Sequence, residues 1–282
     1  MIALFHQQFI QNAFLAGTIV AIVTSIVGYF VVLRAQAFSA ESLTDIGFAG
    51  ATGAALLGIS SLIGMVAFTL TAAFGMGALG KRIKGRDVEV GMILSFALGL
   101  GVLFLKLYTA SATEAVGVLF GSILSVTRFD VILSLGFGVG ILAVLILIFR
   151  PLPFVSIDPE VAEARGINVQ LFSVLFILIL AVTVAEAIQV VGVLLVFALL
   201  IAPGASAQHL TRRPATAILL SIVLGLLFTW GGLFLATISR FPVGFYIATL
   251  SGITYFISIN LGHIFQPHRF EEDNLNEELI QE

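Results

Sequence analysis

Two acidic side chains stand at the edge of an apolar segment, where they could hold a metal ion. Glu41 and Asp45 are four residues apart, which on a helix places both carboxylates on one face, about one turn apart. Adjacent carboxylates repel each other unless a cation or proton lies between them, and acids at a membrane span suggest an ion pathway. Hard oxygen ligands suit Mn²⁺, Fe²⁺ or similar divalent ions. The residues alone leave open an interfacial loop in which Glu41 pairs with Arg34.

A second polar stretch carries the signals of a short capped helix. Asp158 can cap a helix that begins at Pro159, where Glu160 favours the positive end. Gly166 can end the same helix. The stretch 158–166 is therefore predicted to form a helix of about two turns. Such a helix between two spans indicates a docking element, although a loop that happens to be helical stays open.

Glu186 is the third candidate, because it lies toward the outer end of an apolar block. An ionisable residue there could line an aqueous vestibule, contact an outside partner, or snorkel to the interface. None of the histidines has the spacing or position of a metal ligand; they are His6, His209, His263 and His268.

No catalytic constellation is present in the sequence. The chain has no cysteine, which excludes thiolate ligands and disulfides. The stretch Gly75–Lys81 matches the opening of a phosphate-binding loop, but Arg82 stands where Ser or Thr should reach magnesium. We therefore expect no enzyme activity, and any ATP hydrolysis must take place on a separate subunit.

The elements that position these residues are membrane helices. Hydrophobic residues make up 59% of the chain and charged residues 10%, whereas soluble domains have about 25% charged residues. Uninterrupted apolar runs without alternation exclude barrel strands. The sequence thus predicts an all-α polytopic bundle of eight to nine membrane segments within a transmembrane domain at 1–265, followed by an acidic cytoplasmic tail at 266–282. The apolar blocks fall at 10–33, 46–61, 62–80, 91–108, 131–149, 170–189, 191–209, 215–238 and 242–265.

Basic residues in short loops predict the orientation, because such loops stay in the cytoplasm. The densest cluster is at 81–86. Alternation from there places 150–169, 211–214 and the tail inside. The side of the N-terminus stays open, since block 46–61 could be a full span or a re-entrant helix.

Three stretches together carry a resemblance to a known family. They are Leu33–Gly50, the Asp158–Gly166 helix and Val190–Ala207. Over most of residues 10–262 the chain resembles bacterial metal-uptake permeases of the ATP-binding-cassette superfamily, which import zinc, manganese or iron with a separate ATPase and an extracytoplasmic metal-binding protein. The resemblance implies a vitamin-B12-importer-like permease fold and a homodimer in the lipid of the bacterial cytoplasmic (inner) membrane. It implies no permanently bound cofactor and no nucleic-acid partner.

The resemblance also implies roles for single residues. The family's early motif, commonly G-D-x-x-S-H-A, falls on residues 40–46, so that Glu41 and Asp45 correspond to ligands of the ion path. Asp45 stands where the family usually has histidine, which hardens the site and favours manganese or iron over zinc. The helix at 158–166 corresponds to the coupling helix that docks into the ATPase, which implies coupling roles for Asp158, Glu160, Glu163, Arg165 and Gly166.

Two other functions stay open. A stand-alone secondary transporter would need ion-coupling residues within the membrane, for which Glu186 is a candidate, and no docking helix. An importer of a metal chelate or another small solute would keep the same architecture, with Glu41 and Asp45 forming only a gate.

Overall fold

The computed structural model describes residues 7–79, 86–107, 121, 123–211, 213–239 and 241–265. Within these ranges the chain is all-helical and has no strand, as predicted. Most of the basic cluster at 81–86 and the tail at 266–282 lie outside the described residues. The helices are α2 (Gln8–Leu33), α3 (Ala37–Leu56), α4 (Ser61–Leu79), α5 (Arg86–Leu107), η1 (Ile123–Ser125), α7 (Arg128–Ile148), α8 (Pro151–Ile157), α9 (Pro159–Ala164), α10 (Val169–Val191), α11 (Val193–Leu210), α12 (Pro214–Ile238) and α13 (Val243–Phe265).

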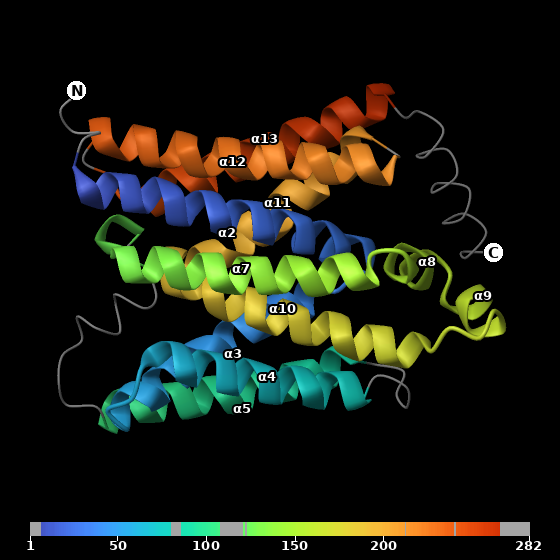
Figure 1. The fold of residues 1–282 in the computed structure, drawn as a ribbon, viewed down its shortest axis with the longest axis horizontal. Helices are drawn as coiled ribbons and strands as arrows, with labels where there is room; N and C mark the ends of the chain where they lie inside the picture. Colours follow the sequence, from blue (N-terminus) through green and yellow to red (C-terminus); the bar gives the residue numbers. More distant parts are fainter. Residues whose placement is uncertain are drawn as a thin grey trace.

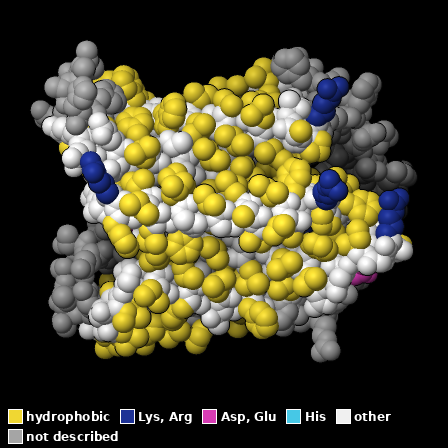
Figure 2. All heavy atoms as spheres, viewed as in Figure 1, with side chains coloured by type: hydrophobic (Ala, Val, Ile, Leu, Met, Phe, Trp, Pro, Cys, Tyr) yellow, Lys and Arg dark blue, Asp and Glu magenta, His cyan; other side chains and the backbone are white. Residues whose placement is uncertain are grey.

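Seven of the described helices are long and apolar enough to cross a membrane. They are α2, α5 from Val90 onward, α7, α10, α11, α12 and α13. Helix α4 contributes a shorter apolar stretch, Ser61–Gly77, and α3 is not among the seven. The count of eight to nine segments therefore stays a prediction. A broad apolar surface covers the visible face, with Lys and Arg toward its two ends (Figure 2), as expected for a bundle that lies in lipid.

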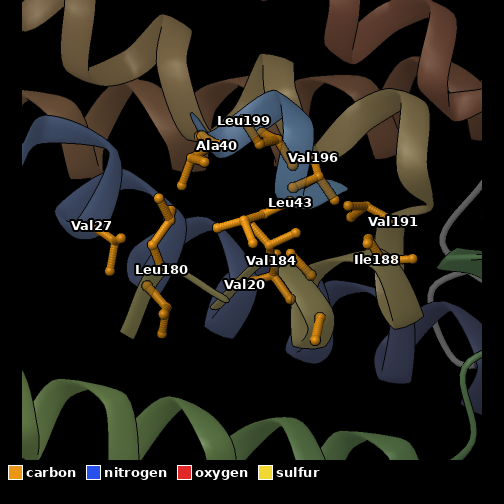
Figure 3. Packing of buried hydrophobic residues seen from close by; sticks show 14 of the residues in the cluster. Val20, Val27, Ala40, Leu43, Leu180, Val184, Ile188, Val191, Val196 and Leu199 are labelled. Carbon is orange, nitrogen blue, oxygen red and sulfur yellow. The ribbon is translucent and has the colours of Figure 1, made fainter. Parts of the chain in front are cut away.

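The core lies where α2, α3, α10 and α11 meet. Of the most apolar part of α2, 67% is buried, whereas for α7 the share is 28%. Helix α2 therefore lies inside the bundle, whereas α7 faces outward, where lipid can cover its apolar side chains. The side chains that pack together here include Val20 and Val27 from α2, Ala40 and Leu43 from α3, Leu180, Val184, Ile188 and Val191 from α10, and Val196 and Leu199 from α11 (Figure 3).

Glycines bring two helix pairs into backbone contact. A methyl group added at Gly28 of α2 would lie 1.6 Å from the carbonyl oxygen of Leu200 in α11. One added at Gly50 of α3 would lie 2.4 Å from the carbonyl oxygen of Gly64 in α4. Small residues allow this close approach, which is how membrane helices gain packing energy in lipid. The position of α3 is therefore fixed by its fit against α4.

Helices α8 and α9 lie at one end of the bundle, and α9 projects beyond it (Figure 1). Helices α2 and α7 both begin at the opposite end (Figure 1). Gly192 separates α10 from α11 with a positive φ of 86°, a conformation that favours glycine. The two ends of the molecule thus carry different features: the docking candidate at one, and the junction of α10 with α11 at the other.

Candidate functional site

Glu41 and Asp45 lie on one helix, as their spacing predicts. Both belong to the first half of α3. Glu41 is exposed and Asp45 is half-buried, and the two carboxylates are close enough to interact electrostatically. Like charges at this spacing destabilise a helix unless a counter-charge lies beside them. The arrangement favours binding of a cation at this face of α3.

The packing of α3 decides where this acidic face points. Leu43 is fully buried in the core, and a methyl group at Gly47 would lie 2.5 Å from Cδ1 of Ile188 in α10. Successive residues of a helix are about 100° apart. Glu41 comes two positions before Leu43, and Asp45 comes two positions before Gly47. Both carboxylates are therefore about 200° around the helix from the face that packs on α10. The core contact turns the carboxylates away from α10.

The neighbouring polar groups of α3 are already satisfied. The hydroxyl of Ser42 donates to the carbonyl of Phe38 over 2.8 Å, and that of Thr44 donates to Ala40 over 2.9 Å. Such bonds to the preceding turn are common for Ser and Thr within helices. The chemistry of this face therefore rests on the two carboxylates.

Arg34, the alternative partner of Glu41, has other contacts. Its guanidinium donates to the hydroxyl of Ser156 over 3.1 Å and to that of Ser173 over 2.7 Å. It also lies 5.2 Å from the centre of the Phe176 ring, within the range of a cation–π interaction. These contacts give Arg34 partners on α8 and α10 other than Glu41.

Two carboxylates cannot fill the coordination shell of a divalent ion. Mn²⁺ and related hard ions prefer about six oxygen ligands. Among the residues that the structure describes, no group of three or more His, Cys, Asp and Glu side chains lies together. Water, backbone or a second protein chain must supply the other ligands.

The capped helix that the sequence predicts at 158–166 is present as α9. The side chain of Asp158 accepts a hydrogen bond from the backbone N–H of Val161 over 3.0 Å, and Pro159 is the first helical residue. Gly166 follows the helix with φ of +80°, which favours glycine. Local capping rules therefore account for both ends of α9.

The surface of α9 is open. Glu160, Glu163 and Arg165 are exposed, as is Val161, while Ala162 is fully buried and anchors the helix. Charged residues around a small apolar patch suit a contact with another protein. The geometry is that of a docking element, and the coupling role of these residues stays a prediction.

The sequence did not predict helix α8, which leads into α9. It begins with Pro151 at its first turn and buries Leu152 and Val155. Proline at the first helical position was the available signal, but an apolar block running directly into a second proline suggested only a loop. The ring of Phe154 lies 5.2 Å from the guanidinium of Arg165, which ties α8 to the end of α9.

Glu186 is enclosed by the protein. Only 2% of its surface is exposed, so it does not snorkel to the membrane interface. It lines a cavity of about 10 Å³ between α7 and α10, together with Asp130, Ser134 and Gln189. The sequence did not single out these three neighbours. The roles of Glu186 in a vestibule or toward a partner stay predictions.

The histidines give no sign of a metal centre in the described part of the chain. The ring of His209 packs edge-on against Tyr255, with centroids 5.8 Å apart. His6, His268 and the side chain of His263 lie outside the described residues. The expectation that histidine does not ligate metal in this chain stays a prediction.

Known proteins resemble this chain over most of its length. The sequence profile of the ABC 3 transport family matches residues 6–262. The manganese transport system membrane protein MntC of Halalkalibacterium halodurans is 31% identical, over 92% of this chain and 90% of its own. The high-affinity zinc uptake system membrane protein ZnuB of Haemophilus influenzae is 28% identical, over 88% and 95%. A solved structure, PsaBC from Streptococcus pneumoniae in complex with Fab, matches with TM-score 0.81 and 30% identity, over 92% and 95%.

Proposed function

This chain belongs to the ABC 3 transport family, and from that membership we propose that it is the membrane-spanning permease subunit of an ATP-driven importer of divalent metal ions. Its cargo is manganese, iron or zinc delivered by an extracytoplasmic binding protein. The observation that carries the proposal is the carboxylate pair on one face of α3, where Glu41 is exposed and Asp45 half-buried. The chain works as a multi-pass protein of the bacterial cytoplasmic membrane.

The ion path lies between two copies of the chain. The carboxylates face away from α10, and in a single chain Glu41 is exposed and Asp45 half-buried. Each chain supplies only part of a coordination shell. A two-fold axis beside α3 would bring four carboxylates together, and a cation between them would offset their repulsion. This supports a homodimer with the path at its interface.

Movement is driven from the end of the bundle that carries α9. The short capped helix exposes Glu160, Glu163 and Arg165 to the surroundings. An ATPase subunit that docks on α9 of each chain can move the bundle when it binds ATP, so that the path opens alternately to the two sides. ATP hydrolysis belongs to that partner.

The ligand types favour manganese or iron as the cargo. A carboxylate at position 45 is a harder ligand than the imidazole that the family usually has there. The related chains include both a manganese and a zinc transport protein by name. The predicted order of preference, with zinc last, follows from Asp45.

Helices α3 and α4 complete the membrane domain in this proposal. With 20 residues, α3 is about 30 Å long, enough to cross the hydrocarbon core. Its polar residues are tolerated because α4 and α5 enclose most of it. Nine crossings then place the start of α2 outside and α9 inside, which agrees with the opposite ends at which they lie (Figure 1). The vitamin-B12-importer-like arrangement is part of the same proposal.

Metal uptake into vesicles tests the ion path. The full chain is reconstituted with its ATPase and binding protein, and ATP-dependent uptake of Mn²⁺ is compared with that of Asp45→Ala and Glu41→Ala. We expect uptake to fall at least about 100-fold in each variant. Mutation of residues that only orient a metal ligand lowers metal affinity or activity by up to about 100-fold, and loss of the ligand itself should have a larger effect. Ser42→Ala is the control, since its hydroxyl bonds to its own helix.

The outcomes separate the alternatives. Unchanged uptake in both carboxylate variants would refute the ion path. Uptake that needs no ATPase and follows a proton gradient would instead identify a secondary transporter. Preferential uptake of a metal chelate over the free ion would leave the carboxylates as a gate.

Charge reversal on α9 tests coupling. In the double variant Glu160→Lys with Glu163→Lys, both exposed carboxylates become ammonium groups, and like charges at an interface repel a partner that was complementary. We expect ATP hydrolysis that no longer drives uptake, measured side by side in the same vesicles. Retained coupling would refute the docking role of α9.

A further inference from the structure

Four oxygen-bearing side chains meet between α7 and α10 at the end of the bundle opposite α9. Asp130 and Ser134 are four residues apart on α7, and Glu186 and Gln189 are three apart on α10. These spacings put each pair on one helix face. All four side chains line the same small cavity, whose other lining residues are Leu62, Leu133 and Phe137.

The innermost of these groups lacks partners. Glu186 is 2% exposed, and neither of its carboxylate oxygens accepts a hydrogen bond of good geometry; among the described groups, the hydroxyl of Ser134 is the donor that lies beside it. Ser134, 4% exposed, is close enough to interact with it. Oε1 of Gln189 is also buried without a partner. A buried carboxylate without compensation costs several kcal/mol.

All three unpartnered atoms are hydrogen-bond acceptors. A ligand of these atoms must therefore bring positive charge or hydrogen atoms. A proton on Glu186 and a water molecule that donates both of its hydrogens would together satisfy the three atoms. A metal cation can be bound by all three oxygens at once, and it also offsets the negative charge. The cavity of about 10 Å³ holds a single ion or water.

The surroundings complete an all-oxygen ligand set. Gln189 donates from Nε2 to Oδ1 of Asp130 over 3.3 Å. The other carboxylate oxygen of Asp130 caps α7 by accepting from the backbone N–H and hydroxyl of Thr127. Glu186 lies within the last two turns of α10, where the helix dipole favours a cation. Two carboxylates would balance the charge of a divalent ion.

We propose that this cluster is a second cation site, separate from the ion path, which binds one small hard divalent cation such as Mn²⁺ through four side chains: Asp130, Ser134, Glu186 and Gln189. An ion enters past Asp130 and Gln189, which are half-buried, and is held by Glu186. Bound there, it ties α7 to α10. The inference depends on the proposed function only for the choice of Mn²⁺ as the probe.

Binding of Mn²⁺ to the purified full-length chain tests the proposal. The chain carries Glu41→Gln and Asp45→Asn, which remove the carboxylates of the ion path. Mn²⁺ is added in steps, and the EPR signal of the free ion gives the amount that is bound. We expect one bound Mn²⁺ per chain. Adding Glu186→Gln should weaken this binding at least about 10-fold, and Ser134→Ala should weaken it less, because the hydroxyl is a neutral ligand.

A control on the same helix separates ligand loss from general damage. Thr183→Val changes a buried residue one turn from Glu186, whose hydroxyl donates to the carbonyl of Ile179 over 2.8 Å. It should leave Mn²⁺ affinity unchanged. Equal affinity in Glu186→Gln and Thr183→Val would overturn the proposal and identify Glu186 as a protonated carboxyl group.

Two further outcomes are informative. Absence of bound Mn²⁺ in the background variant would also overturn the second site. If instead a Glu186-dependent ion is found while uptake is insensitive to Asp45→Ala, the ion path fails and the second site stands. The two proposals are thus decided by different measurements.

Discussion

The two acidic regions of this chain lie on opposite sides of α10 and differ in what encloses them. Glu41 is exposed and Asp45 half-buried, on a face of α3 that points away from α10. Glu186 is 2% exposed, in a cavity that α7 residues line on the other side. The same functional group can therefore serve transient binding in one place and stable binding in the other.

The difference in enclosure depends on which parts of the molecule supply the oxygen ligands around each acidic group. The face of α3 has no third acid or histidine beside it among the described residues, so its coordination shell must be completed from outside. The Glu186 cluster takes its oxygens from two helices of one chain. A transported ion must leave its site again, which is easier where another chain or water supplies part of the coordination shell. An enclosed set of ligands from one chain favours retention of the ion.

The largest contrast is expected in chemical accessibility. The natural chain has no cysteine, so Glu41→Cys and Glu186→Cys each create one thiol. A buried thiol reacts only in locally opened states, and an opening free energy of about 3 kcal/mol corresponds to roughly 100-fold slower labelling. The rate of maleimide attachment to the purified chain, followed by mass spectrometry, measures this ratio.

The labelling experiment carries its own reference. Both variants should label equally fast after denaturation in detergent and urea. Equal rates in the folded chain would show that the Glu186 cavity is open, and the contrast between the two regions would fail.

Replacing a carboxylate should change the stability of the metal-free chain more at the buried region than at the exposed one. Glu186→Met removes a buried carboxyl group that has only the Ser134 hydroxyl beside it among the described groups, and it should raise the apparent stability by about 1–4 kcal/mol in chelator. Glu41→Met changes an exposed position and should stay within about 0.5 kcal/mol. Both values come from unfolding of the purified chain in detergent, measured by tryptophan fluorescence or by calorimetry.

Added Mn²⁺ should reduce or reverse this difference in stability at the buried region. The natural chain gains about 2.7 kcal/mol at an ion concentration 100 times the dissociation constant, and Glu186→Met gains nothing there. A Glu186→Met chain that is less stable than the natural one in chelator would contradict the idea of an unsatisfied buried carboxylate.

Local features of the sequence predicted the shared helix face of the carboxylate pair and the capped helix α9. The four-residue spacing of Glu41 and Asp45 fixes a shared helix face wherever a helix forms. The cap at Asp158, the first-turn Pro159 and the stop at Gly166 act within one helix, and α9 has all three. Apolar blocks near the membrane thickness gave the all-helical bundle because lipid permits little else.

The remaining features depend on tertiary contacts that spacing does not encode. Asp130 and Gln189 are 59 residues apart and join across α7 and α10. Glu186 therefore looked like an interfacial residue, because its burial depends on how α7 packs. Arg34 likewise contacts residues more than 100 positions away. The number of crossings depends on α3, whose polar residues lower its hydropathy while α4 and α5 enclose it.

The smallest effect is expected where only the type of ligand changes. Asp45→His replaces a hard carboxylate with the imidazole that the resemblance implies for the family at this position, and zinc accepts imidazole better than manganese does. The ratio of Zn²⁺ to Mn²⁺ uptake in reconstituted vesicles should rise by roughly 10-fold. This is the lower end of the changes in metal affinity that follow when the surroundings of a metal ligand are altered. Ser42→Ala is the control, because its hydroxyl donates to the carbonyl of Phe38 in its own helix. It should leave the uptake ratio unchanged. A ratio that shifts with Glu186→His but not with Asp45→His would exchange the roles of the two regions.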